Sequence, residues 1–354
     1  MHSFDGHNDA LLRLWRSEGD GPTLFLEGAP RGQLDLPKAQ AGGMVGGLYA
    51  IFVPSDDKGA AFREPMDTVP YDVPLPPPPS MSPAQKATFE MASILFRIAD
   101  RSGGRVRICR SVADIRAAKA AGAHAPVLHI EGCEAIDTDL AFLDLLYAAG
   151  LRSLGPVWSR SNIFGHGVPF RFPSSPDTGD GLTDLGRALV KRCNELRIMV
   201  DLSHMNEKGF WDIAKLSDAP LVATHSNAHA LCASSRNLTD KQLAAIAETG
   251  GLVGVNYAVS FLRSDGRRVA TTPLDTVVDH IAYLVDKLGE DGVGLGSDFD
   301  GAMIPEDLKT AAGLPNLVAA MRTRQFGEAL IEKICFENWM RVLARTWGEP
   351  ESCQ

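Results

Sequence analysis

The sequence predicts an α/β fold, a (β/α)8 barrel of the TIM type, and two observations support that prediction. Eight short apolar runs, each ending in polar residues or glycine, recur at residues 3–7, 44–53, 126–131, 151–158, 198–204, 220–225, 251–257 and 292–298. Several of them are apolar without alternation, as is typical of strands buried on both faces. Helical segments separate most of the runs, which favours a closed parallel barrel over a doubly wound open sheet. The open sheet also lacks support because no Gly-x-Gly-x-x-Gly loop follows a strand.

The helices are predicted from apolar residues at helical spacing between the runs. The clearest segments are residues 138–149, 182–197, 206–216, 239–248 and 273–288. Thr183 and Asn206 stand at the start of two of these segments, where a side-chain oxygen can cap the free backbone N–H groups.

A proline-rich excursion at residues 54–83 interrupts this alternation. Its prolines, up to and including Pro83, exclude a helix or a central strand there. We expect either a rim of the active-site mouth or a solvated extended loop. One or two helices at about 325–347 close the fold, and residues 1–354 form a single catalytic barrel domain with no internal repeat.

The composition limits the classes of function. Of 354 residues, 45% are hydrophobic, which is enough for a large core, and the net charge of −9 argues against binding to nucleic acid or to an anionic membrane. No secretory signal, lipid-anchor signal or membrane span is visible, and the six cysteines form no Cys-x-x-Cys pair. These features predict a cytoplasmic protein with reduced thiols.

The predicted chemistry comes from side chains at the carboxyl ends of the strands, which converge on one face of such a barrel. These side chains are His7, Asp9, Glu131, His204, His225 and Asp298. The set exceeds the three protein ligands of a typical open zinc site and fits two divalent ions, with a carboxylate such as Glu131 bridging them. A water between two such ions loses its proton near neutral pH, which predicts metal-assisted hydrolysis, most naturally of an amide.

Other polar residues near these strand ends have competing interpretations. Arg236, in the loop beyond His225, is either a clamp for a substrate carboxylate or a surface arginine at a helix start. His129, two residues before Glu131, is expected to be a hydrogen-bonded core histidine one layer down. His280 lies in a predicted helix and is expected at the surface.

Over nearly its whole length the chain resembles the membrane dipeptidase (renal dipeptidase, M19 metallopeptidase) family. The matching segments are Asp5-Gly6-His7-Asn8-Asp9, Glu131-Gly132, 181–183, Asp201-Leu202-Ser203-His204, His225-Ser226-Asn227-Ala228, Cys232, Ser235-Arg236-Asn237-Leu238 and Gly296-Ser297-Asp298-Phe299-Asp300-Gly301. The resemblance implies a metallo-dependent hydrolase barrel with two zinc ions that cleaves dipeptides, including some with a D-configured second residue, and that often forms homodimers.

The resemblance also implies a role for each site residue. His7 and Asp9 would hold one ion, His204 and His225 the other, and Glu131 would bridge them. Asp298 would act as the general base and return the proton to the departing amine, while Arg236 would bind the free carboxylate of the dipeptide.

The fourth predicted strand departs from the family pattern. Trp158 stands about where the family's best-known members carry a histidine that helps to stabilise the oxyanion, so Arg160, Asn162 or His166 is expected to substitute for it. Two other functions therefore stay open. One is a binuclear amidohydrolase acting on N-acyl amino acids or other small amides, and the other is a barrel that binds metal or peptide without turnover. Manganese or cobalt would also suit these ligands.

Overall fold

The computed structural model describes residues 1–55, 66 and 68–348. Eight parallel strands form its main sheet, in the order β7-β5-β4-β2-β1-β10-β9-β8. Their bounds are β1 Ser3–Asn8, β2 Met44–Phe52, β4 Ala125–Glu131, β5 Leu151–Gly155, β7 Met199–Val200, β8 Val222–Ser226, β9 Leu252–Val255 and β10 Val293–Leu295. A parallel bridge between Asp201 and Val222 joins the two outermost strands. The sheet thus forms a nearly closed ring, and the predicted (β/α)8 barrel is confirmed.

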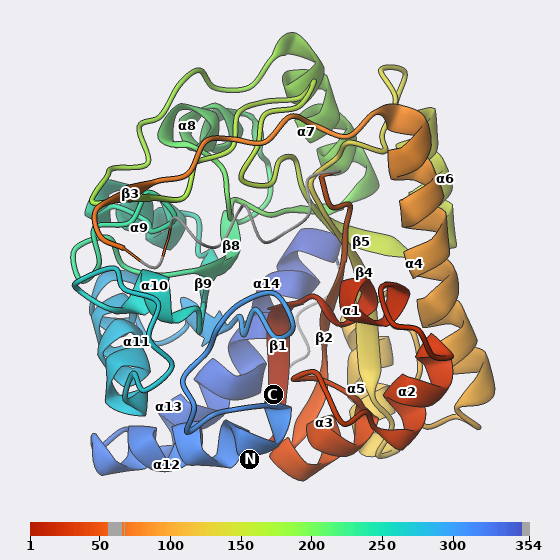
Figure 1. Cartoon of the computed structure of the whole chain (residues 1–354), viewed down its shortest axis with the longest axis vertical. Coiled ribbons are helices and arrows are strands. Elements are labelled where there is room, and N and C mark those ends of the chain that lie inside the picture. Colours follow the sequence, from red (N-terminus) through yellow and green to blue (C-terminus); the bar gives the residue numbers. More distant parts are fainter. Residues whose placement is uncertain (56–65, 67, 349–354) are drawn as a thin grey trace.

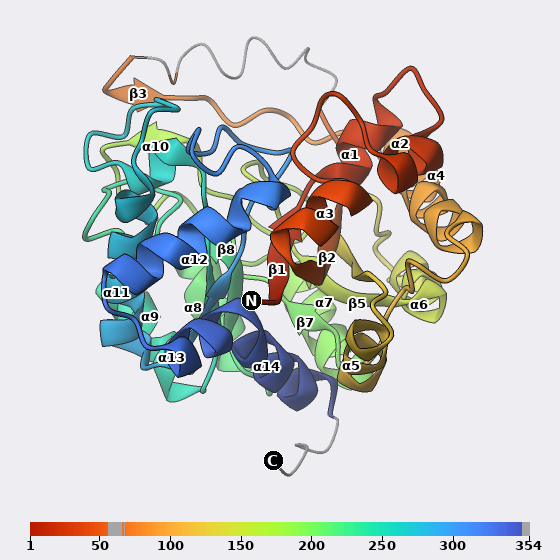
Figure 2. The same cartoon turned by 90° about the horizontal axis from the view of Figure 1, so that it is seen from below.

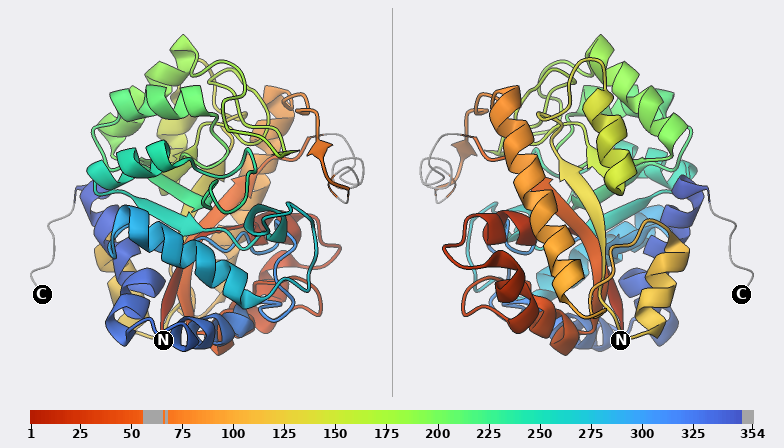
Figure 3. Two further views of the ribbon diagram at one scale, coloured as in Figure 1. Left: turned by 90° about the vertical axis from the view of Figure 1, so that its left-hand side faces the viewer. Right: turned by 90° about the vertical axis from the view of Figure 1, so that its right-hand side faces the viewer.

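Helices surround the strands on the outside (Figures 2 and 3). Their bounds are α1 Ala10–Trp15, α2 Gly21–Glu27, α3 Leu36–Gly42, α4 Met81–Arg101, α5 Val112–Ala120, α6 Ala141–Ala149, α7 Asp184–Leu196, α8 Glu207–Leu216, α9 Asp240–Glu248, α10 Val259–Leu262, α11 Leu274–Leu288, α12 Leu314–Thr323, α13 Glu328–Glu332 and α14 Asn338–Trp347. A π-helical turn, Lys333–Glu337, joins the last two. Among the helices described, none has both the length and the apolar content that crossing a bilayer requires.

The helices predicted from apolar spacing are present as α6, α7, α8, α9 and α11. Two of the predicted start signals act as caps. The Thr183 side chain accepts a hydrogen bond from the Gly186 N–H, and the Asn206 side chain accepts one from the Gly209 N–H. Each cap satisfies a backbone donor that the first turn of a helix leaves free.

The proline-rich excursion differs from the expectation in one respect. Pro83 lies in the first turn of α4, where the N–H that proline lacks would have no helical partner, so the residue is tolerated there. Farther back, β3 (Tyr71–Asp72) pairs with β6 (Arg171–Phe172) in a small antiparallel ribbon. In Figure 1, β3 of this ribbon lies far from the N-terminus, where β1 begins. Residues 56–65 and 67 of the excursion lie outside the described part of the chain.

The amino-terminal end of the barrel is filled by one large side chain. Trp339 of α14 is fully buried, and its indole N–H donates to the Leu295 carbonyl at 2.9 Å. A Cβ atom at Gly6 in β1 or at Gly294 in β10 would collide with this indole. Glycine at these two positions therefore leaves the space that the Trp339 indole fills. The indole closes the barrel at the end opposite the site.

Candidate metal centre

The strands bring the predicted site residues together at their carboxyl ends. His7 lies in β1, Glu131 ends β4 and His225 lies in β8. Asp9 follows β1 directly, and His204 and Asp298 lie in the short segments that come after β7 and β10. All of these side chains are buried except Asp298, which is partly exposed.

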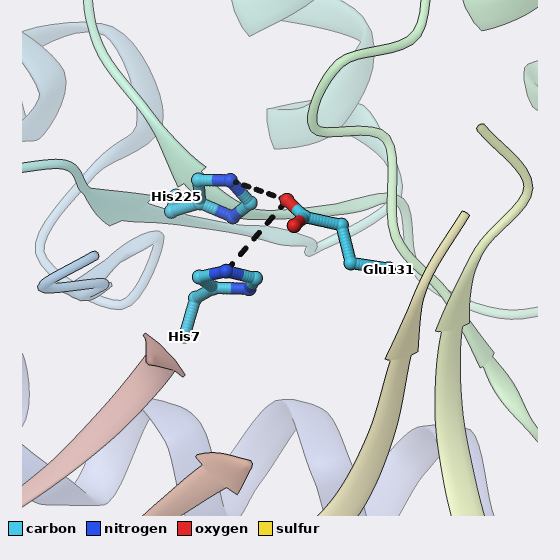
Figure 4. Close-up of side chains that lie close together, drawn as sticks. All are labelled: His7, Glu131 and His225. Carbon is cyan, nitrogen blue, oxygen red and sulfur yellow. Dashed lines mark ion pairs between the residues drawn. The ribbon is translucent and has the colours of Figure 1, made fainter. Parts of the chain in front are cut away.

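Three imidazoles gather around one carboxylate oxygen. The Oε1 atom of Glu131 lies 2.9 Å from Nε2 of His204, 3.3 Å from Nε2 of His225 and 3.6 Å from Nε2 of His7. Figure 4 shows the Glu131 carboxylate pointing toward His7 and His225. The Nε2 atoms of His204 and His225 are themselves only 3.1 Å apart.

The hydrogen bonds behind His225 indicate which of its nitrogens is free to bind a ligand. The Thr224 hydroxyl donates to Oδ2 of Asp201 at 2.6 Å, because a carboxylate oxygen only accepts. The same hydroxyl therefore accepts from Nδ1 of His225, 2.8 Å away, and the proton of the neutral ring resides on Nδ1. The Nε2 lone pair of His225 then faces Glu131. Ser159 Oγ occupies the corresponding place 2.8 Å from Nδ1 of His204.

This arrangement fits a cation. The Glu131 oxygen faces the Nε2 atoms of His204 and His225, whose rings stay neutral, and acceptors so close together need a positive charge between them. Both ring nitrogens of His7 and Oδ1 of Asp9 are buried without a hydrogen-bond partner. Buried polar atoms in that state usually have a ligand to serve.

Within the described part of the chain, two groups of three residues offer ligand atoms within 4.8 Å of one another, and they share His7. One group is His7, Glu131 and His225, and the other is His7, Asp9 and Asp298. Gly301 allows the second group to form, because a Cβ atom there would collide with the carboxylates of Asp9 and Asp298.

The charges of the site shift the pKa values of its members. Burial lowers the pKa values of His204 and His225 well below the usual range, which keeps both rings neutral as metal ligands must be. For His7, burial opposes the charge, but the surrounding carboxylates prevail and raise its pKa to about 10. Burial, with Asp9 adding to it, raises the pKa of Asp298 to about 6 against the lowering effect of His7.

Arg236 is buried beside these groups and is not a surface residue. Its Nη2 donates to the His225 carbonyl at 3.1 Å, and its guanidinium lies 5.4 Å from the centre of the Phe261 ring. Its Nε has no hydrogen-bond partner. Burial lowers the pKa of Arg236 to about 10, although Asp298 and Glu131 oppose this, so the group stays charged at neutral pH. A buried guanidinium with an unused donor is suited to an anionic group of a ligand.

Aromatic rings cover the site on the side of the β3–β6 ribbon. Trp158 packs against His204 with ring centres 5.8 Å apart, and Phe170 stacks on Phe261 at 5.8 Å. Tyr71 and Phe172 of the ribbon belong to the same apolar cluster. Through Tyr71 the described part of the proline-rich excursion packs into this cluster, next to the rings that contact His204.

The residues expected to replace the family histidine near Trp158 make other contacts. Arg160 is fully buried and donates to Glu134 at 2.7 Å, to Ser55 at 3.0 Å and to the Val53 carbonyl at 2.6 Å. The Asn162 amide donates to the Pro156 carbonyl at 2.8 Å. Both side chains are thus used in holding loops together, which contradicts an oxyanion role for them.

His166 likewise makes a local contact, its Nδ1 lying 2.9 Å from Ser161 Oγ.

Two other histidines can now be assigned. His129 is buried with Nδ1 2.9 Å from Ser153 Oγ, as its spacing before Glu131 predicts. The prediction of a surface position for His280 is wrong. This residue is buried on the inner side of α11, where Nδ1 accepts from the Ala228 N–H and Nε2 lies 2.9 Å from the Leu262 carbonyl oxygen. Helical spacing predicts a surface position for an isolated polar residue. His280 instead lies inside, where it bonds to backbone atoms of Ala228 and Leu262.

Sequence reasoning missed Asn256 as a site residue. Its Nδ2 donates to Oδ2 of Asp298 at 3.0 Å, and this hydrogen bond lowers the pKa of Asp298. Its only sequence signal is a polar residue directly after the apolar run of β9, where the other strands carry ligand-type residues.

Comparisons with known proteins show the family of the chain. Residues 1–349 match the membrane dipeptidase family (peptidase family M19). An uncharacterized protein in the pqqA 5′ region of Klebsiella pneumoniae is 50% identical over 261 residues, which cover 74% of this chain and 96% of that protein.

Solved structures extend the match to the whole fold. The crystal structure of a metallopeptidase from Rhodobacter sphaeroides, liganded with a phosphinate mimic of the dipeptide L-Ala-D-Ala, is 54% identical. It has a TM-score of 0.96 and covers 98% of this chain and 99% of its own. The dipeptidase AC, a metallopeptidase of family M19, matches with the same identity, coverage and TM-score. This chain belongs to the membrane dipeptidase family, the M19 metallopeptidases.

Proposed function

We propose that the chain hydrolyses dipeptides with free amino and carboxyl ends, L-L and also L-D, with two zinc ions held by its strand-end residues. One observation carries the proposal: three imidazole nitrogens surround one buried carboxylate oxygen, beside a buried arginine with an unused donor. The L-Ala-D-Ala mimic bound by the Rhodobacter sphaeroides metallopeptidase supports the substrate class and the D-configured second residue.

In the proposal, His7 and Asp9 would hold one ion, His204 and His225 would hold the other, and Glu131 would serve both. The grouping of His7 with Asp9, the closeness of His204 and His225 to Glu131, and the unpartnered atoms of His7 and Asp9 support the assignment. When bound, the ions supply Lewis acidity for the scissile carbonyl and lower the pKa of water.

The remaining steps belong to side chains of this chain. Arg236 binds the carboxylate of the dipeptide and so fixes the distance of the scissile bond from the site. Asp298, with Oδ2 bound to Asn256, takes the proton of the attacking water on Oδ1. As the C–N bond breaks, Asp298 returns this proton to the departing amine nitrogen, and two amino acids leave. The aromatic cover of Trp158 and Phe170 limits bulk water at the reacting bond.

The experiment is a measurement of amine release from a panel of dipeptides by protein loaded with zinc, manganese or cobalt. The panel contains free L-L and L-D dipeptides, their N-acetyl forms and their C-terminal amides. We expect cleavage of the free dipeptides alone, in both stereochemical series. Cleavage of the N-acetyl forms instead would move the protein to the hydrolases of N-acyl amino acids. No cleavage of any compound by metal-loaded protein would favour the non-catalytic barrel.

The C-terminal amides test Arg236 within the same panel. The parent protein should prefer the free carboxylate over the amide, and Arg236→Met should remove most of that preference. Equal preference in the parent and the variant would contradict the proposed role of Arg236.

Homodimer formation and a cytoplasmic location remain predictions. Light scattering of the purified protein and fractionation of the cells that make it are the respective tests.

A further inference from the structure

We propose that Asn256 is a positioning residue that holds the Asp298 carboxylate at a fixed place relative to Arg236. It does so through hydrogen bonds within a buried chain of asparagines. The inference rests on the proposed function, in which Asp298 moves the proton and Arg236 binds the substrate carboxylate. It adds a residue that touches neither the substrate nor the metal.

The need for a holding group follows from the exposure of Asp298. The other members of the site are buried, whereas Asp298 is partly exposed, so its carboxylate has fewer neighbours to hold it than theirs. Asp298 also has a φ of 59°, in the left-handed region that few non-glycine residues adopt, although aspartate does so more readily than most. The hydrogen bond from Asn256 Nδ2 at 3.0 Å fixes one carboxylate oxygen and leaves the other for the proton.

Hydrogen bonds fix both the side chain and the backbone of Asn256. It is fully buried, and its Oδ1 accepts from the Ala258 N–H at 2.6 Å, which fixes the direction of its amide group. Asn227 then grips its backbone, because Asn227 Oδ1 accepts from the Asn256 N–H at 3.2 Å and Asn227 Nδ2 donates to the Asn256 carbonyl at 2.9 Å. The amide of Asn256 therefore points at Asp298 in a single orientation.

The chain of contacts reaches Arg236 by two routes. The His225 carbonyl accepts from Asn256 Nδ2 at 3.4 Å and from Arg236 Nη2 at 3.1 Å. The Phe261 carbonyl accepts from Asn227 at 3.4 Å and from Asn237, the neighbour of Arg236, at 2.8 Å. Asn227, Asn237 and Asn256 are each at most 1% exposed, so water does not compete for these contacts. The loops after β8, β9 and β10 are thereby fixed relative to one another.

The test uses metal-loaded protein and a dipeptide that the parent cleaves. In Asn256→Ala we expect kcat to fall by about 10–100-fold, the usual size of effect when the support of an active-site group is lost. KM should stay within about threefold, and metal content should equal that of the parent, because Asn256 contacts Asp298 rather than a proposed ligand side chain. A kcat within about twofold of the parent would overturn the proposal.

A matched control is Asn338→Ala at the other end of the barrel. Asn338 is 2% exposed, and its amide donates to the Glu290 and Val293 carbonyls at 2.7 and 2.8 Å. This control also removes a buried amide that serves two partners, so it should destabilise the protein to a similar extent while sparing kcat. An equal loss of kcat in both variants would mean that a structural defect, not positioning, explains the effect, and would overturn the proposal.

A double-mutant cycle separates this inference from the proposed function. In an Asp298→Asn background, Asn256→Ala should lower kcat by less than about twofold, since the group that it positions is already lost. A further loss as large as in the parent background would show that Asn256 acts elsewhere. If Asn256→Ala does not fold, Asn256→Val fills more of the space, has no side-chain donor, and should lower kcat by a similar factor.

Crystal structures keep the test independent of turnover. The Asp298 carboxylate should leave its position in Asn256→Ala and keep it in Asn338→Ala. If the parent cleaves no dipeptide, the proposed function fails, yet an unmoved Asp298 in the Asn256 variant would still overturn this inference and a displaced one would support it.

Discussion

The two ends of the barrel differ in how their buried polar atoms are satisfied. At the amino-terminal end, the Trp339 indole and the Asn338 amide donate to strand and loop carbonyls, and the space between the strands is filled. At the carboxyl end, His7 Nδ1, Asp9 Oδ1 and Arg236 Nε are buried without partners. Buried polar atoms without partners cost free energy. Such atoms occur elsewhere too, Ser3 Oγ at the start of β1 among them, but the group at the carboxyl end combines a histidine, a carboxylate and an arginine, as a ligand site does.

The largest effect is expected from removing the Glu131 carboxylate, the hydrogen-bond acceptor at the centre of the carboxyl end. Glu131→Gln removes the charge that the three imidazoles face, so metal content should fall and turnover of dipeptides should drop by about 10³-fold or more. Metal analysis of the purified protein and single-turnover assays measure both effects. A variant with the metal content and turnover of the parent would contradict the bridging role of Glu131.

Glu134→Gln is the matched control for that experiment. Glu134 is also buried, three residues farther along, but its Oε1 accepts from Arg160 at 2.7 Å and not from the site histidines. Breaking this ion pair should destabilise the fold and leave metal content unchanged.

A substitution at the amino-terminal end should change the free energy of unfolding rather than the rate of the reaction. Trp339→Ala leaves a cavity beside Gly6 and Gly294, which should lower the free energy of unfolding by about 3–5 kcal/mol. Denaturant unfolding measures the loss, while kcat per folded molecule should stay at the parent value. A selective loss of kcat would show that the two ends are coupled through the strands.

The sequence predicts the carboxyl end better than the amino-terminal end. His7, Glu131, His204 and His225 can be found because ligand chemistry demands particular residue types, and the topology puts them at strand ends. Trp339 cannot be matched with Gly6 from the sequence, since their contact depends on how the strands and α14 meet in space.

Two of the remaining errors have the same cause. His280 and Asn256 bond to loop atoms far away in the chain, and neither apolar spacing nor residue type reports such partners. The prediction that Pro83 excludes a helix fails for another reason. Proline is tolerated in the first turn of a helix, and where α4 begins decides that Pro83 lies in that turn. Supporting contacts around a site are thus less predictable than the ligands themselves.

A smaller effect is expected from Asp298→Asn. The amide keeps the shape of Asp298 but cannot take a proton, so kcat should fall by about 10²-fold, with metal content close to that of the parent. Rapid-quench measurement of the first turnover distinguishes slow chemistry from slow product release. Turnover at the parent rate would exclude Asp298 as the general base. A loss of metal instead would make it a ligand, in keeping with its place beside His7 and Asp9.

The smallest effect is a pH dependence that distinguishes an empty site from a loaded one. In the metal-free protein the carboxylates raise the pKa of His7 from 6.5 to about 10. The charged ring therefore stabilises the metal-free fold fully below pH 6.5, and this contribution is lost as the pH rises through about 10. Metal binding needs the neutral ring, so it must release this proton at neutral pH.

Apparent metal affinity should consequently rise by about tenfold per pH unit between pH 7 and 9, and the gain in Tm on adding metal should widen over the same range. Calorimetric titrations in two buffers of different ionisation enthalpy count the protons released. His7→Gln should reduce that count by one. His124→Gln should not, because burial already lowers the pKa of that ring to about 4 and keeps it neutral. A metal affinity independent of pH would mean that His7 is not charged in the empty site, and that the carboxylates around it are neutralised in another way.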